Sequence, residues 1–334
     1  MSVVAGARSA SRAQWADAVA GWARRNAWTL GLIGLLIFFL VFTRVIQPRY
    51  GIAGIQGLAI SVFPLALAAV AQAVVVIAGG IDLSIGSVMA LTSVISATLM
   101  EGQSPEFAIV VVVGVLVLGL VIGAINGIVV VVTRVPDIVV TLAMLFVWAG
   151  VALIVRSAPG GSAAPWLREL VSGSLVFDWL PRAAVVLVVM VGIIWLPLMR
   201  TRAGLSLYAV GSNPLAAFRS GISIGWTKVF AYMLAGLFAA LGGLSLTAST
   251  GIGTPVPGPY TLMSVAAVVL GGVSLAGGRG GVFGPIVAVV VLQLIRTDMT
   301  FLRVNTNLAV VSQGIILIVV VMVGSLIELR RARG

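Results

Sequence analysis

The chain has 334 residues, of which 60% are hydrophobic and 9% are charged, and its formal net charge is +11. Soluble globular proteins carry about 25% charged residues, so this composition excludes a water-soluble enzyme. His and Cys are absent, which excludes disulfides, thiol or imidazole nucleophiles, and metal sites built on sulfur or imidazole. The basic residues are scattered between long apolar runs, so we expect anionic lipid headgroups, and not nucleic acid, as their counter-charge.

Apolar runs long enough to cross a hydrocarbon core of about 30 Å recur along the whole chain. They predict an all-α, polytopic integral membrane bundle of about ten transmembrane helices. The third, eighth and ninth runs are short, so we expect those helices to be tilted, broken or re-entrant. The predicted spans are residues 28–46, 58–78, 85–99, 107–132, 138–155, 183–199, 229–249, 261–276, 282–295 and 308–327.

The distribution of Lys and Arg predicts the orientation of these spans. Ten crossings place both termini on one side, and cytoplasmic loops carry the excess of basic residues. With both termini in the cytoplasm, thirteen of the twenty basic residues lie inside and seven lie outside. The predicted regions are a cytoplasmic segment 1–27 with an interfacial helix, a transmembrane domain 28–327 that includes the long cytoplasmic loop 200–228, and a cytoplasmic tail 328–334.

Ionisable residues and the single lysine restrict the source of energy. Of the nine acidic residues we place only Asp82 close to a span interior, which disfavours an ion-coupled carrier. The sole lysine, Lys228, is preceded by Thr227 and followed by Val229, so no Walker A motif is possible. If ATP drives this protein, another polypeptide binds the ATP and its Mg²⁺, and we expect no cofactor and no metal in this chain.

Uncharged polar residues within the spans leave two interpretations open. Each can form an interhelical hydrogen bond that holds the bundle together, or it can line a substrate path, because polar groups at membrane depth often face a cavity. Asn126 stands out because it borders a Gly119, Gly123 and Gly127 seam that lets another helix approach closely. The polar residues are Gln72, Asn126, Thr141, Ser245, Thr247, Gln293 and Gln313. The candidate substrate pathway consists of Gln72, Asp82, Ser84, Asn126, Thr141 and Gln313.

The segment Gly79 to Ser87, with the sequence GGIDLSIGS, predicts a break between the second and third spans. The paired glycines allow a tight turn, after which Asp82 can act as the N-cap of the next helix. A second interpretation makes the Asp82 carboxylate an acceptor for substrate hydroxyls. The segment resembles the GG-I-D-L-S-x-G signature of permease subunits of ATP-binding cassette importers for monosaccharides, the ribose, xylose and arabinose group.

The resemblance extends from about the second span to the last. Asn126-Gly127, PDIVVTLAM at 136–144 and VLGGVSLAGGRGG at 269–281 are similar to stretches of that family, in the same order. Gly79, Gly80, Leu83 and Gly86 of the first break recur 192 residues later as Gly271, Gly272, Leu275 and Gly278. We interpret this recurrence as two turns of the same kind, and not as an internal repeat of the fold. The structural signature residues are Gly79, Gly80, Gly86, Gly271, Gly272, Gly277 and Gly278.

The resemblance implies a multi-pass permease of the bacterial plasma membrane that is not itself an enzyme. It also implies a translocation pathway for a monosaccharide that an extracytoplasmic sugar-binding protein delivers. The implied partners are a second permease chain, as homodimer or heterodimer, and one or more ATP-binding subunits. Two alternatives stay open: a permease of the same superfamily for a nucleoside, a branched-chain amino acid or a furanone-type signal, and a channel or secondary carrier.

The loop 200–228 contains a predicted short helix, residues 214–220. Asn213 can cap this helix, Pro214 suits its first position, and Gly221 can close it. The helix resembles the coupling helix by which such permeases dock into a groove of the ATPase, and we expect Ala217 to enter that groove. Leu215 stands where the family usually has Glu. The implied ATPase-coupling residues are Asn213, Pro214, Leu215, Ala216, Ala217, Phe218, Arg219 and Gly221.

Overall fold

The computed structural model describes residues 27–175, 177–256 and 258–304, and six further helical positions at 308, 311, 314, 315, 318 and 322. The predicted interfacial helix, most of the predicted tenth span with Gln313, and the tail 328–334 lie outside the described residues. Within them the helices are α2 (Ala27–Ile46), α3 (Ile52–Ile77), α4 (Ile85–Met100), α5 (Pro105–Thr133), α6 (Asp137–Val155), α7 (Pro165–Val171), α8 (Arg182–Met199), α9 (Arg202–Ser212), α10 (Pro214–Arg219), α11 (Ile224–Thr250), α12 (Tyr260–Leu270) and α13 (Phe283–Phe301).

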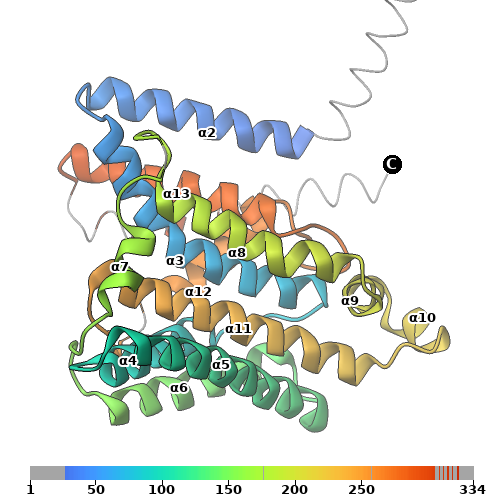
Figure 1. Cartoon of the computed structure of the whole chain (residues 1–334). Coiled ribbons are helices and arrows are strands. Elements are labelled where there is room, and N and C mark those ends of the chain that lie inside the picture. The colour runs from blue at the N-terminus through green and yellow to red at the C-terminus, as the bar shows by residue number, and fades with distance from the viewer. Residues whose placement is uncertain are drawn as a thin grey trace, which may run out of the picture.

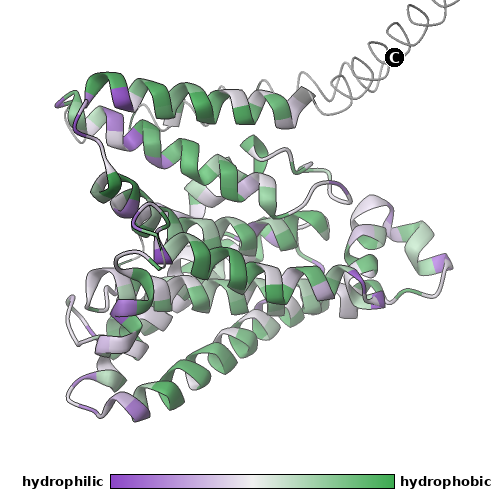
Figure 2. Cartoon of the chain, turned by 45° about the horizontal axis from the view of Figure 1, so that its top comes forward, coloured by the Kyte–Doolittle hydropathy of each residue, from purple (hydrophilic) through white to green (hydrophobic). Residues whose placement is uncertain are grey.

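The predicted all-α membrane bundle is confirmed. Among the described residues seven helices are long and apolar enough to cross a membrane, and α4 and α12 are shorter apolar helices of 16 and 11 residues. These two are the third and eighth predicted spans, which we expected to be short. Hydrophobic residues predominate along the middle of the helices, while hydrophilic residues are more frequent at their ends and in the loops (Figure 2).

The ninth span differs from the prediction. It forms α13, which has 19 residues and continues past Ile295 to Phe301. Arg296 and Asp298, which we predicted to lie outside the spans, are therefore part of this helix, and Asp298 is only 3% exposed. The polar side chains do not interrupt the backbone hydrogen bonds of the helix, and at its end the Leu302 N–H still donates to Asp298 O at 2.9 Å.

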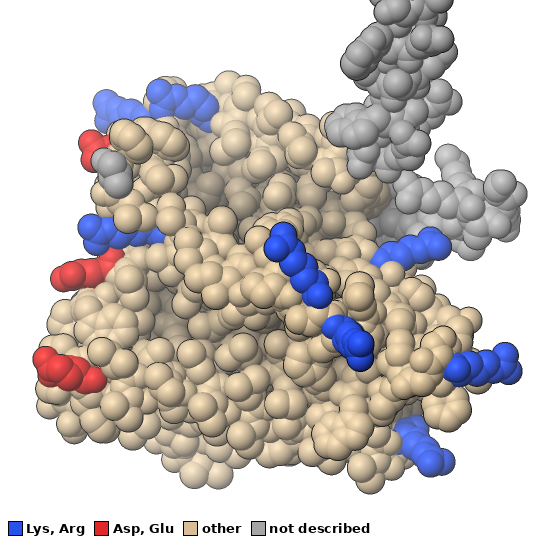
Figure 3. All heavy atoms as spheres, turned by 45° about the vertical axis from the view of Figure 1, so that its right-hand side comes forward, with Lys and Arg blue, Asp and Glu red and all other residues tan. Residues whose placement is uncertain are grey.

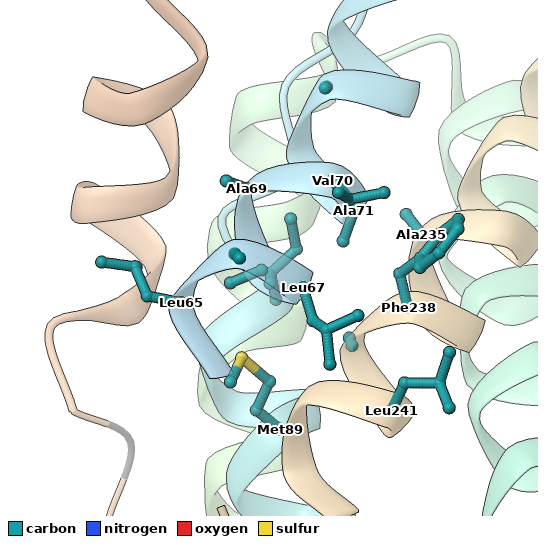
Figure 4. Packing of buried hydrophobic residues seen from close by; sticks show 14 of the residues in the cluster. Leu65, Leu67, Ala69, Val70, Ala71, Met89, Ala235, Phe238 and Leu241 are labelled. Atoms are coloured by element: carbon teal, nitrogen blue, oxygen red, sulfur yellow. The ribbon is translucent and has the colours of Figure 1, made fainter. Parts of the chain in front are cut away.

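Helix α3 lies at the centre of the bundle (Figure 1). From Val62 to Ile77 every residue is buried, because the helix is apolar on all sides. Many of these residues are alanines, and small side chains allow neighbouring helices to pack closely. In Figure 4, Leu67 and Val70 lie beside Phe238 and Leu241 of α11, while Leu65 points away from α11.

The glycine seam of α5 packs against α11. A Cβ atom added at Gly119 would lie 2.6 Å from the carbonyl oxygen of Gly236, and one at Gly127 would lie 2.8 Å from Cα of Val229. Gly123 approaches the backbone of Tyr232 in the same way. The seam predicted from the sequence therefore brings the backbones of α5 and α11 into direct contact.

Charged residues divide between the two ends of the bundle. Helices α9 and α10 project at one end, which we name the α10 end (Figure 1). Basic side chains without acidic ones lie toward this end on the face shown in Figure 3, and the acidic side chains visible there lie toward the opposite end. This distribution agrees with a cytoplasmic α10 end, although the orientation itself stays a prediction.

Candidate functional site

The break after α3 is built around a tight turn. Helix α3 ends at Ile77, and Gly79 follows with φ +84°, a left-handed conformation that favours glycine. The Gly79 N–H donates to Val76 O (2.9 Å) and the Gly80 N–H to Val75 O (3.0 Å), which closes the helix. Seven residues without helical structure, 78–84, then cross to α4.

The Asp82 carboxylate is the centre of a buried hydrogen-bond chain. Its Oδ1 accepts from the Ser84 N–H (2.8 Å) and from the Ser84 hydroxyl (2.6 Å). Asn126 on α5 donates from Nδ2 to Ser84 Oγ (2.8 Å), and its Oδ1 accepts from the indole N–H of Trp148 on α6 (3.0 Å). Asp82, Ser84 and Asn126 are each no more than 3% exposed. The chain thus ties the break to two neighbouring helices.

The break is also held from α3 and α6. In the orientation that satisfies both of its side-chain atoms, Gln72 donates to Asp82 O (2.8 Å) and accepts from the Asp82 N–H (3.3 Å). Thr141 Oγ1 accepts from the Leu83 N–H at 3.1 Å. Five of the six predicted pathway residues therefore meet at one place, and the sixth, Gln313, lies outside the described residues. All five are engaged with the protein itself, as expected for residues that shape a break.

The N-cap prediction for Asp82 is wrong in its detail. Ser84 occupies the N-cap position of α4, and Asp82 forms a turn immediately before it. An N–H of the first turn of α4, that of Gly86, donates instead to the Thr261 hydroxyl of α12 (3.0 Å). The carboxylate does accept from a backbone N–H ahead of the helix, but the start of α4 is completed by another helix.

Of the three other polar span residues, two form bonds between helices. The Thr247 hydroxyl of α11 is 3.0 Å from the Ser93 hydroxyl and 3.1 Å from the Ser96 hydroxyl of α4. Gln293 of α13 donates to Ser61 O of α3 at 2.9 Å. Ser245 donates to Gly242 O within α11. Thr247 and Gln293 therefore match the interpretation as contacts that hold the bundle together.

A partly buried ion pair beside the break was missed by the sequence analysis. Lys228 Nζ on α11 lies 3.1 Å from Oδ1 of Asp137, the first residue of α6, and the Tyr232 hydroxyl donates to Asp137 Oδ2 (3.2 Å). We had placed Asp137 in a loop. The sequence did contain a sign of this pair, because Lys228 and Asp137 each directly precede a predicted span and both were expected at the same end of the bundle.

The second glycine-rich segment forms a similar turn. Helix α12 ends at Leu270, and Gly272 has φ +80° with its N–H donating to Val269 O (3.0 Å). Gly272 is thus the counterpart of Gly79, and the two turns are 193 residues apart. The sequence pattern paired residues that are 192 apart, so its alignment of the two segments is wrong by one residue. The turn chemistry is shared, but Leu83 and Leu275 do not correspond.

Both glycine turns meet the end of α9. The Gly278 N–H donates to Ile77 O at 2.9 Å, which joins the second turn to the end of α3. Gly211 of α9 lies between them, because an added Cβ there would meet Ile77 and the Gly278 nitrogen. Burial raises the pKa of Tyr208, so its hydroxyl stays protonated and donates to Gly280 O (2.8 Å). Helix α9 is therefore in contact with both turns.

The short helix predicted in loop 200–228 is present as α10, directly after α9. Asn213 caps it, with Oδ1 accepting from the Ala216 N–H at 3.0 Å, and Pro214 occupies the first position. Gly221, with φ +81°, closes it through a bond to Phe218 O (2.9 Å). The prediction extended the helix by one residue, since Ser220 is its C-cap.

Helix α10 presents an apolar face to solvent. Leu215 is 58% exposed and Phe218 is 65% exposed. Ala217, in contrast, is 4% exposed, because it faces the rest of the chain. The expectation that Ala217 enters a partner's groove therefore does not hold, and the available face consists of Leu215 and Phe218.

A bundle with seven apolar helices of membrane-spanning length among the described residues defines a multi-pass membrane protein. Residues 54–321 match the sequence profile of the family described as the permease component of the branched-chain amino acid transport system. The chain belongs to this family, so it is an ABC-type permease of the sugar import group and a multi-pass protein of the bacterial inner membrane. Membership of this family excludes the alternative of a channel or secondary carrier.

Three relatives cover most of the chain. The ribose import permease protein RbsC of Escherichia coli K12 is 30% identical over 310 residues, which are 89% of this chain and 94% of the relative. The galactose/methyl galactoside import permease protein MglC of Haemophilus influenzae is 33% identical, over 74% and 79%. The autoinducer 2 import system permease protein LsrD of E. coli O9:H4 is 29% identical, over 92% and 94%. No solved structure matches the chain.

Proposed function

We propose that this chain forms the translocation pathway of an importer for a monosaccharide, which an extracytoplasmic binding protein delivers. Two copies of the chain, or this chain and a second permease, assemble with ATP-binding subunits that hydrolyse ATP. The sugar class is supported by the similarity to permeases named for ribose and for galactose. Because ATP binds to the partner subunits, this chain contributes the pathway and the mechanical connection.

The observation that carries this proposal is the position of α10. A capped helix exposes Leu215 and Phe218 at the end of the bundle, and apolar side chains of this size are typical anchors in a partner's groove. Helix α10 follows α9 after a single residue, Asn213, and α9 touches both glycine turns. Movement of the ATPase subunits would therefore reach the break at Asp82 through a short, packed path.

A second candidate substrate is a furanone-type signal. LsrD, whose name assigns it to autoinducer 2 import, is similar to this chain over 92% of its length. The two candidates differ in the solute that the binding protein presents, and not in the mechanism.

Uptake and co-purification test the proposal together. The chain is co-expressed with the ATP-binding and binding-protein genes that neighbour it, and cells are assayed with radiolabelled ribose, xylose, arabinose, galactose, autoinducer 2 and leucine. We expect an ATP-binding subunit to co-purify and one sugar to be taken up. Uptake of autoinducer 2 alone would favour the second candidate. Uptake of leucine alone, or a chain that purifies without an ATPase, would overturn the proposal.

A further inference from the structure

A polar cavity of about 400 Å³ lies near the end of the bundle opposite α10, between α3, α11, α12 and α13. Helix α11 begins beside the α10 loop and ends at Thr250, which lines the cavity. Eight of its twelve lining residues are polar, in a chain that is 60% hydrophobic. A hollow with several convergent polar groups is the usual form of a small-molecule site.

One face of α13 supplies the densest part of this lining. Gln293, Arg296, Thr297 and Thr300 stand at positions i, i+3, i+4 and i+7, so they lie on the same side of the helix. Ser61 of α3 also lines the cavity, and its carbonyl oxygen accepts from Gln293 at 2.9 Å. One wall of the cavity is therefore the polar face of α13, and the remaining lining contains both polar and apolar residues.

The side chains on this face of α13 still have donors and acceptors that form no hydrogen bond within the described protein and can bind a ligand. Thr297 and Thr300 donate their hydroxyl protons to Gln293 O (2.8 Å) and Arg296 O (3.0 Å), so each hydroxyl oxygen retains lone pairs that can accept. The Arg296 guanidinium has five N–H donors, and it forms no hydrogen bond or ion pair with any residue the structure describes. The cavity thus combines unused donors with unused acceptors.

We propose that this cavity is a binding site for the polyhydroxylated solute on its way into the translocation pathway. The Arg296 guanidinium donates to the solute's hydroxyl oxygens, and the Thr297 and Thr300 hydroxyls accept from its O–H groups. The volume lies within the range of about 300 to 1,000 Å³ that is usual for small-molecule sites. This inference rests on the proposed function and adds the place where the sugar first contacts the permease.

A second cavity shows what a site unsuited to a sugar looks like. It has a volume of about 300 Å³, lies at the α10 end, and is lined mostly by apolar residues such as Ala203, Trp226, Phe230 and Met233. A polyol placed there would lose its hydrogen bonds to water without replacing them. Ser206 also lines this second cavity and provides a matched control position.

Protection of an introduced cysteine tests the site directly. The chain has no cysteine, so Thr297→Cys can be labelled selectively with a maleimide in the intact, purified permease–ATPase complex. We expect millimolar concentrations of the transported sugar to slow labelling about threefold or more, with leucine and added salt without effect. Labelling of Ser206→Cys should not change. If sugar leaves Thr297→Cys labelling unchanged, the proposal is wrong. It is equally wrong if only a sugar acid, or only an anionic lipid, protects this position.

Removal of the guanidinium gives a second, independent readout. Arg296→Gln should lower the maximal rate of sugar uptake about tenfold, because a hydrogen bond from a charged group is lost. Arg49, like Arg296, is an exposed arginine, but it does not line the cavity, so Arg49→Gln removes the same charge and should keep wild-type uptake. Normal uptake by Arg296→Gln would overturn the cavity assignment and leave the proposed function intact. Absence of sugar uptake by the wild-type protein would instead overturn the proposed function.

Discussion

Lys228 Nζ lies 3.1 Å from Oδ1 and 3.2 Å from Oδ2 of Asp137, and this contact joins the start of α11 to the start of α6. The two side chains are 26% and 14% exposed, so they are largely shielded from water. Gly80 lies directly against the carboxylate, since an added Cβ there would meet Asp137 Oδ2. The only lysine of the chain thus helps to hold the break in place.

Removal of one partner should therefore cost more than removal of both. We expect Lys228→Met to lower the free energy of unfolding by about 1 to 3 kcal/mol, because the Asp137 carboxylate is left without its countercharge. The double variant Asp137→Asn/Lys228→Met should be less destabilised than Lys228→Met alone, and therefore less than the sum of the two single variants. Thermal unfolding in detergent, followed by tryptophan fluorescence, measures this. Strictly additive losses would show that the two residues do not interact.

Substitution of Asp82 separates its two interpretations. Asp82→Asn keeps an oxygen that can accept from Ser84, so we expect normal assembly and near-normal sugar uptake. Asp82→Ala leaves the buried Ser84 N–H without its acceptor and should lower stability by about 1 to 3 kcal/mol. The amount of assembled protein and the uptake rate are measured together. An Asn variant that assembles fully but does not transport would make Asp82 part of the substrate pathway.

The contact between α9 and the glycine turns should be sensitive to a single methyl group. Gly211→Ala would place a carbon 2.6 Å from the Gly278 nitrogen, so α9 must move away from both turns. We expect reduced uptake per ATP hydrolysed, measured in proteoliposomes. Gly281→Ala lies in the same glycine-rich segment with nothing within 4 Å and serves as the control. Equal coupling in the two variants would contradict a role of this contact.

The predicted orientation can be tested with one cysteine at each end. Arg219→Cys on α10 should be labelled by a membrane-impermeant maleimide only after the cells are opened, whereas Glu101→Cys at the opposite end should be labelled in intact cells. The chain has no competing thiol. Labelling of Arg219→Cys from outside would reverse the orientation and remove the basis for docking at α10.

Hydropathy and local motifs were sufficient to predict most of the fold. Apolar run length located the spans, and the Asn213, Pro214 and Gly221 pattern located α10, because caps act within a few residues. The end of α13 was missed because Arg296 and Asp298 interrupt the apolar run, while helical hydrogen bonding continues through them. Hydropathy describes how readily each side chain leaves water for an apolar phase. It therefore cannot show that polar residues on one face of a helix line a cavity.

The candidate site was predicted in part. Motif resemblance selected Asp82, Ser84 and Asn126, which the fold brings into one hydrogen-bond chain. The Lys228–Asp137 pair was missed because its members are 91 residues apart, and only the tertiary structure shows which helix starts are neighbours. The burial of Ala217 was also missed, since a helix of six residues does not reveal from sequence which face packs on α9.

The most direct test of the account is sugar uptake by Phe218→Asp. Phe218 is 65% exposed, so the charge faces water in the isolated chain, and the thermal unfolding of the variant should match that of the wild type. In the ATPase groove the same charge would be buried without a partner, and we expect about a tenfold or greater loss of ATP-driven uptake together with loss of ATPase co-purification. A stable Phe218→Asp chain that retains the ATPase and wild-type uptake would contradict coupling through α10.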